Sequence, residues 1–183
     1  MNSVKPDQDI VIQIAENYKG INFSSPKIKK LVKTIISRSQ SNKIRGPLSK
    51  ARKIEISIAI VDDATFRRLN KQFLNSNSTS DCLSFDLSDK TCELTKHFEL
   101  VINGEMAVKQ AKLRDHSSEA ESALYITHGL LHHLGFNDLT EDKAKKMHAA
   151  EDEILQQLGY GLVYNKKINT GKKNKSPVNK VNG

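Results

Sequence analysis

Alternating apolar and polar residues, or short apolar runs, predict β-strands in four parts of the chain. The clearest lies at residues 54–60, where isoleucine occupies every second position. A period of two places these isoleucines on one face of a pleated strand. A similar alternation predicts a short strand at residues 9–15, and two apolar runs predict strands at residues 82–87 and 98–103. The segment between these two runs, residues 88–97, is predicted to be a connection.

Apolar residues spaced three and four apart predict five helices. Ser, Thr and Asp at their starts are typical N-caps. Gly135 and Gly159 follow the last periodic residues of two helices, where a left-handed backbone favours glycine. Polar stretches at residues 39–53 and 75–80 are predicted loops. The predicted helices run from Ser24 or Ser25 to residue 38, from Asp62 or Asp63 to Leu74, from Met106 to Leu113, from Ser117 or Ser118 to Leu134, and from Thr140 to Leu158.

The order of these elements, β-α-β-α-β-β-α-α-α, predicts an α+β fold in which helices pack on a sheet of about four strands. A length of 183 residues fits one such domain. We expect this domain to cover residues 1–164. Residues 165–183 show no periodicity and consist mainly of Lys, Asn, Gly and Ser, which predicts a basic disordered tail.

The positive charge is concentrated in two segments. The chain has a formal net charge of +8, and residues 27–53 alone hold ten Lys or Arg and no acid. Residues 165–183 hold six Lys and no acid, which leaves the rest of the chain with a net charge of −8. This distribution favours a polyanionic partner such as nucleic acid, because Lys and Arg release counterions from phosphates. The alternative is a solvated helix face and a solubilising tail.

Composition argues against several classes of protein. No apolar stretch approaches the roughly 20 residues of a membrane helix, so we expect no membrane partner. Residues 1–9 lack the apolar core of an export signal. The two cysteines, Cys82 and Cys92, have no CxxC spacing, which excludes a disulfide framework and a cysteine-rich zinc module. We therefore expect a cytoplasmic protein.

Two histidines four residues apart are the strongest candidate for chemistry. In a helix this spacing places His128 and His132 on one face, where both imidazoles can bind one metal ion. Gly135 then ends the helix and lets the chain reverse, which can bring Asp138 back as a third ligand. Two nitrogens and one oxygen with an open position are typical of a catalytic zinc site. The alternative is an interior helix face with hydrogen-bonded histidines, and His133, rotated by about 100°, is predicted to face elsewhere.

The same spacing, HxxxHxxGxxD, also matches the long zinc signature of metzincin proteases, HExxHxxGxxH, with Asp in the last position. Position 129 is Gly, so the glutamate that serves as general base in those enzymes is missing. Met147 lies in a helical stretch and not in an evident Met-turn. A metalloprotease is therefore kept only as an alternative.

The segment HGLLHHLGFND at residues 128–138 resembles the signature HGxLHLxGxDH of the YbeY-type rRNA maturation factors, a family of metal-dependent endoribonucleases. The resemblance implies that His128, His132 and Asp138 are the metal ligands, with Asp138 in place of the usual histidine. Aspartate is a competent zinc ligand. The resemblance extends over residues 54–159 and includes Leu69-Asn70 with TSDCLSF at residues 79–85, ELVIN at residues 99–103, and the helix at residues 147–159.

The resemblance also implies a fold: a mixed sheet of four strands, packed helices, and a metal site in a cleft at the end of a central helix. The family segment that corresponds to TSDCLSF at residues 79–85 is TDVLSF. In this family an arginine that is proposed to contact RNA phosphate commonly precedes that segment, and Leu74 occupies its position here. Leucine cannot make a charge-assisted phosphate contact. Arg67, Arg68 or Lys71 can substitute from the preceding helix, or they are ordinary surface charges.

Two further residues are candidates for lining the cleft. Asp81 and Ser84 lie in the TSDCLSF block that resembles the border of the family's active cleft. In the alternative interpretation, Asp81 caps a turn and Ser84 faces solvent.

These features predict a cytoplasmic, zinc-dependent endoribonuclease, with one zinc ion held by His128, His132 and Asp138. The resemblance implies a preference for single strands and a role in small-subunit rRNA 3′ end processing and ribosome quality control. It also implies rRNA, a small-subunit ribosomal protein and an Era-type GTPase as partners. The alternative from another class is a noncatalytic ribosome-assembly factor that binds RNA through its basic segments and contains a structural metal.

Overall fold

The computed structural model describes residues 8–41, 48 and 50–164. The predicted tail at residues 165–183 lies outside this part, as does some of the basic segment at residues 27–53, so the end of the domain stays a prediction. The described strands are β1 (Asp9–Glu16), β2 (Lys53–Val61), β3 (Cys82–Asp86) and β4 (Thr95–Asn103). The described helices are α1 (Ser25–Ser41), α2 (Asp63–Leu74), α3 (Gly104–Arg114), α4 (Ser118–His133) and α5 (Glu141–Gln157).

The four strands form one mixed sheet in the order β1-β2-β4-β3. β1 and β4 both run parallel to β2, and β3 is antiparallel to β4. The predicted α+β class and all four predicted strands are therefore confirmed. β4 begins at Thr95, earlier than its apolar run, because Thr95 pairs with Lys53 at the start of β2 and extends the ladder. The predicted connection is correspondingly shorter.

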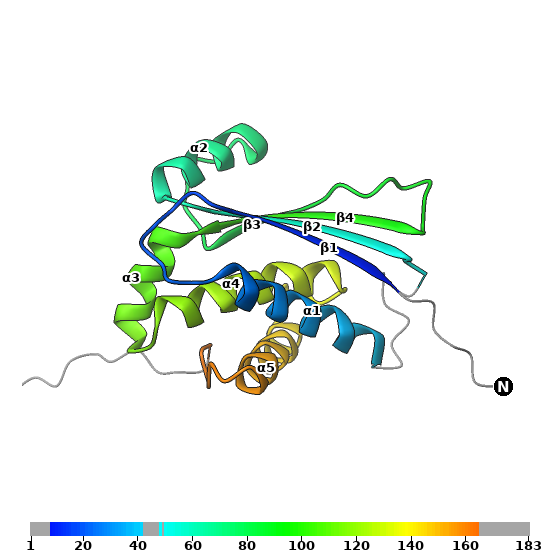
Figure 1. Ribbon diagram of the computed structural model, residues 1–183. Helices are drawn as coiled ribbons and strands as arrows, with labels where there is room; N and C mark the ends of the chain where they lie inside the picture. The colour runs from blue at the N-terminus through cyan, green and yellow to red at the C-terminus, as the bar shows by residue number, and fades with distance from the viewer. Residues whose placement is uncertain (1–7, 42–47, 49, 165–183) are drawn as a thin grey trace, which may run out of the picture.

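Helices cover both faces of the sheet, with α2 on one side and α1, α4 and α5 on the other (Figure 1). The isoleucines of β2 and the apolar residues of β4 from Phe98 to Ile102 at even positions pack with α1, α4 and α5 in the main core. Val61 and Val101 point to the opposite face, where they form a smaller core with Phe66 of α2. α4 therefore lies between the sheet and α5, which makes it the central helix of the fold.

The helix ends follow the capping residues. Asp62, Ser117 and Thr140 accept backbone hydrogen bonds as N-caps of α2, α4 and α5, as predicted. Gly135 and Gly159 have φ values of 91° and 86°, the left-handed backbone that was expected after α4 and α5. In the described part of the chain, no helix combines the length and apolar character that crossing a membrane requires.

Candidate metal centre

His128, His132 and Asp138 meet at the C-terminal end of α4. One donor atom from each lies within 4.8 Å of the other two. The Nε2 atoms of His128 and His132 are 3.1 Å apart, and His128 Nε2 is 3.9 Å from Asp138 Oδ2. Ligands bound at about 2.0 Å to a tetrahedral zinc ion lie roughly 3.3 Å apart, so the two histidines match this spacing and the Asp138 oxygen lies somewhat beyond it.

The chain reversal after α4 brings Asp138 to the histidines. Phe136 N donates to Leu131 O at 3.0 Å, and Gly135 N donates to His132 O at 3.1 Å. With the positive φ of Gly135, these bonds form the Schellman motif that ends a helix and turns the chain. The sequence spacing thus predicted the three-residue group.

Glu151 of α5 fixes the orientation of His128. Its Oε1 lies 2.8 Å from His128 Nδ1, and its side chain is fully buried. Carboxylate oxygens accept hydrogen bonds, so Nδ1 donates and the lone pair of His128 lies on Nε2, the atom that faces His132 and Asp138. From the sequence, Glu151 could be placed only on a helix whose residues resemble the last helix of the family. Its role depends on the packing of α5 against α4, which the sequence pattern does not reveal.

Electrostatics near His128 favour its protonated form when no cation is bound. Burial alone lowers the pKa of His128, but the hydrogen bond and charge of Glu151 act against it. The nearby carboxylates of Asp81 and Asp138 add to this effect, and together they raise the pKa above the usual value. The same negative potential attracts a metal cation, which competes with the proton for Nε2.

His133 faces away from this group, as predicted. Its ring stacks on Phe98, with centroids 4.3 Å apart, and its Nε2 contacts the hydroxyl of Ser84. Burial lowers the pKa of His133. Ser84 also donates to Gly129 O at 3.2 Å. Ser84 therefore neither lines the cavity described below nor faces solvent, because β3 carries it beneath α4.

Gly129 explains why the metzincin pattern is incomplete. A Cβ on Gly129 would lie 2.9 Å from Leu100 Cδ2, in the buried contact between α4 and β4. Position 129 therefore faces the sheet, whereas His128 and His132 lie toward Asp138. A larger side chain at position 129 would therefore have to displace Leu100. The arrangement thus argues against peptide hydrolysis by the metzincin route.

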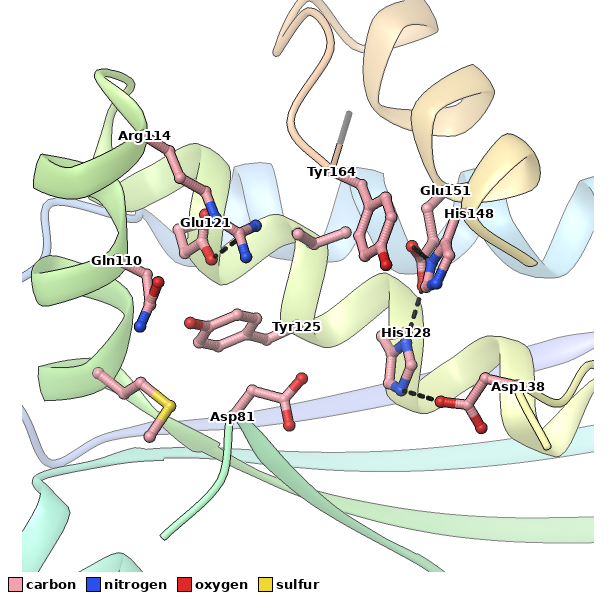
Figure 2. A pocket seen from close by; sticks show the side chains of 12 residues that line it. Asp81, Gln110, Arg114, Glu121, Tyr125, His128, Asp138, His148, Glu151 and Tyr164 are labelled. Atoms are coloured by element: carbon pink, nitrogen blue, oxygen red, sulfur yellow. Dashed lines mark hydrogen bonds and ion pairs between the residues drawn. The ribbon is translucent and has the colours of Figure 1, made fainter. Parts of the chain in front are cut away.

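A cavity of about 450 Å³ extends from the metal group along α4 (Figure 2). Four carboxyl groups and one guanidinium group are among its lining, so its surface is more acidic than basic. Asp81 lies on this wall, as predicted, and also accepts from Cys82 N at 2.9 Å, which is the alternative turn-capping role. The lining residues are Asp81, Met106, Gln110, Arg114, Glu121, Leu124, Tyr125, His128, Asp138, His148, Glu151 and Tyr164.

The other end of the cavity contains a buried ion pair that the sequence did not reveal. Glu121 lies 2.9 Å from His116 Nε2 and 3.5 Å from Arg114, and its side chain is only 1% exposed. Burial raises the pKa of Glu121 against the opposing effects of Arg114 and His116. Arg114 is the last residue of α3 and Glu121 lies on α4, so their contact links these two helices beside the cavity.

A hydrogen-bond network around Asn103 positions Asp81. The Asn103 amide donates to Asp63 Oδ1 at 2.8 Å and to Thr79 Oγ1 at 2.9 Å. Its backbone N donates to Asp81 O at 2.9 Å. Hydrogen bonds from Thr79 and Arg67 lower the pKa of Asp63 to about 2, with a further contribution from Asn103. The network thereby joins α2, β4 and the segment that resembles the family's cleft border.

Leu74, at the position of the family arginine, is the last residue of α2 and its side chain is 58% exposed. Arg67 of the same helix pairs with Asp63 at 2.7 Å, so its charge is partly neutralised. Arg68 and Lys71 are exposed.

Comparison with known proteins identifies the family. The sequence profile described as "Endoribonuclease YbeY" matches residues 13–159. The chain belongs to the endoribonuclease YbeY family. It is 35% identical to the Endoribonuclease YbeY of Caldicellulosiruptor bescii over 139 residues, which cover 70% of this chain and 87% of that protein. It is 28% identical to the Shouchella clausii Endoribonuclease YbeY over 162 residues, covering 82% and 98%.

A solved structure supports the fold. The solution structure of TM1509 from Thermotoga maritima superposes with a TM-score of 0.52 and 17% identity, and covers 81% of this chain and 89% of that one. The family supports an RNA-cleaving hydrolase, and the YbeY resemblance read from the residues is confirmed.

Proposed function

We propose that this YbeY-family protein is a zinc-dependent, single-strand-preferring endoribonuclease that acts in small-subunit rRNA 3′ end processing and ribosome quality control. The observation that carries the proposal is the grouping of two imidazole nitrogens and one carboxylate oxygen within 4.8 Å, at the rim of a cavity in an endoribonuclease family fold. His128, His132 and Asp138 are the ligands of one zinc ion. The proposed location is the cytoplasm.

The chemistry of the cavity supports a bound cation. The cavity is lined by four carboxyl groups and by one guanidinium group, that of Arg114. Without a bound cation, these carboxylates would repel RNA phosphate. When bound, a zinc ion supplies positive charge that stabilises the developing charge on phosphate and acidifies water. Glu151 keeps His128 in the tautomer that can bind the ion. The carboxylates of Asp81 and Asp138 also line the cavity, where they can accept hydrogen bonds from water or from RNA hydroxyls.

The proposed partners follow from the family and from charge. rRNA is the substrate, and a small-subunit ribosomal protein and an Era-type GTPase are proposed as protein partners. The described part of the basic segment supports contact with RNA, since Lys29, Lys30 and Lys33 are exposed on α1. A noncatalytic assembly factor with a structural metal is the second candidate, because Leu74 occupies the position of the family arginine that is proposed to contact RNA phosphate.

The test is the metal content and RNA cleavage of untagged protein. Wild type, His132→Ala and the matched control His133→Gln are measured by elemental mass spectrometry and incubated with a single-stranded RNA oligonucleotide and its duplex. We expect one zinc per chain in wild type and the control, loss of zinc in His132→Ala, and cleavage only where zinc is present. Unchanged cleavage in folded His132→Ala would refute the metal assignment. If His132→Ala unfolds and loses zinc, and wild type does not cleave RNA, the results favour the assembly factor.

A further inference from the structure

We propose that His148 is the general base of RNA cleavage, oriented by Glu151, an inference that rests on the proposed endoribonuclease function. Gly129 has no side chain that could accept a proton, and the nearby carboxylate of Asp81 already accepts a hydrogen bond from Cys82 N through its Oδ1. His148 is the additional imidazole that shares the cavity with His128 and Asp138.

Glu151 binds two histidines at once. Its Oε1 lies 2.8 Å from His128 Nδ1, and its Oε2 lies 2.8 Å from His148 Nδ1. His148 comes one turn before Glu151 on α5 and its side chain is 16% exposed, whereas the Glu151 side chain is fully buried. One carboxylate therefore ties His148 to the metal group while leaving His148 in contact with the cavity (Figure 2).

The hydrogen bond sets the tautomer of His148. Because the Glu151 oxygen accepts, His148 Nδ1 donates, and the lone pair of the neutral ring lies on Nε2. The same carboxylate-to-imidazole arrangement prepares the base of serine hydrolases. Tyr164 stacks on the ring, with centroids 3.4 Å apart and planes at 12°. The backbone N of Tyr164 donates to Asp152 Oδ1 at 3.2 Å, so this stacking partner is itself held in place.

The proposed step balances as a hydrolysis. His148 Nε2 takes one proton from a water molecule in the cavity as the water oxygen forms a bond to phosphorus. One P–O ester bond of the RNA backbone breaks, and its oxygen takes a proton from solvent. His148 then returns its proton to solvent. The products are one phosphate monoester end and one hydroxyl end.

Kinetics provides the first test. Zinc-loaded His148→Gln and His148→Ala are compared with wild type and with His97→Gln, a partly buried histidine that does not line the cavity. A general base contributes about 10²–10⁴-fold, so we expect kcat to fall at least about 100-fold in both His148 variants. KM and zinc stoichiometry should change less than twofold, and added imidazole should restore part of kcat in His148→Ala. His97→Gln should match wild type.

Nitrogen NMR provides a readout that does not depend on activity. In ¹⁵N-histidine-labelled protein, neutral His148 should show a protonated Nδ1 and an unprotonated Nε2. Glu151→Gln should disturb this tautomer because an amide can donate to the ring.

The outcomes separate the two proposals. Absence of cleavage by zinc-loaded wild type overturns the endoribonuclease function and this inference with it. Two results overturn the inference alone: a wild-type kcat in the His148 variants, or a proton on Nε2 of neutral His148. A 2′,3′-cyclic phosphate product also overturns it, since this product would mean that the ribose hydroxyl, and not water, attacks phosphorus. Loss of zinc from His148→Gln would likewise overturn it, because His148 would then act on metal retention.

Discussion

Gly129 lies against Leu100 so closely that a Cβ at position 129 would be 2.9 Å from Leu100 Cδ2. This contact joins the central helix to the sheet at the residue next to His128, the position at which the zinc-protease signature has its glutamate. Where the zinc proteases have a glutamate that acts as general base, this chain has Gly129, which packs against Leu100 of the sheet.

We expect Gly129→Ala to lower the free energy of unfolding by up to about 2 kcal/mol, because the usual cost of about 1–3 kcal/mol for an extra methyl group in a filled core is partly offset by the gain of about 1 kcal/mol from alanine over glycine in a helix. Leu100→Val removes the atom that clashes and costs about 1 kcal/mol alone. The double variant should be more stable than the sum of the two single losses predicts, as measured by denaturant unfolding. Strict additivity of the two losses would show that α4 shifts away from β4 instead of pressing on Leu100.

Asp138 should tune the affinity for the metal. Asp138→His supplies the nitrogen ligand that is usual in the family, so we expect zinc to stay bound and the preference for zinc over magnesium to rise. Asp138→Ala should weaken zinc binding by roughly 100-fold or more, since loss of even a supporting residue costs 10–100-fold. Competition with a zinc-binding dye measures both affinities. Equal affinity in wild type and Asp138→Ala would remove Asp138 from the ligand set.

The network around Asp63 should make stability depend on acid pH. The pKa of Asp63 is about 2 in the folded protein, below its ordinary value of 3.8, so its contribution is fully present above pH 3.8. That contribution is lost as the pH falls toward 2. Wild type should therefore be more stable than Asp63→Asn at pH 6, and the difference should begin to shrink below about pH 4. Chemical unfolding of both proteins from pH 6 to pH 3 measures this difference in the free energy of unfolding. A difference that stays constant over this range would contradict the hydrogen bonds assigned to Asp63.

Leu74→Arg tests whether the missing arginine limits RNA binding. If α2 lies along the RNA path, the new charge should tighten binding and add about one to the salt slope. Leu94→Arg, at another exposed leucine, makes the same change of charge in the β3–β4 connection. We expect a larger effect at position 74 than at position 94 in salt titrations of a single-stranded RNA. Equal effects would mean that Leu74 carries no special role.

The features that could be predicted from the sequence are those that depend on local periodicity or on short spacing between residues. The alternation at residues 54–60 predicted β2, and the spacing of His128, His132 and Asp138 predicted that these three residues meet, because one helix and one turn bring them together. Glu151 and Asn103 could not be assigned roles, since their partners lie on other elements and are brought to them only by packing. Glu151 falls on the same helical stripe as the apolar Met147 and Leu155, and a charged residue within such a stripe is the signal that could have found it.

The lysines at residues 165–183 should contribute to RNA binding through charge alone. Six lysines that each release counterions from single-stranded RNA account for a salt slope of up to about 4, so deletion of the segment should lower affinity and make the slope shallower by up to that amount. A variant with all six changed to Gln keeps the length and should behave like the deletion, because the effect comes from charge and not from contacts of defined shape. Fluorescence anisotropy across a salt series measures the slope. An unchanged slope would assign these lysines to solubility and leave α1 as the basic surface to test.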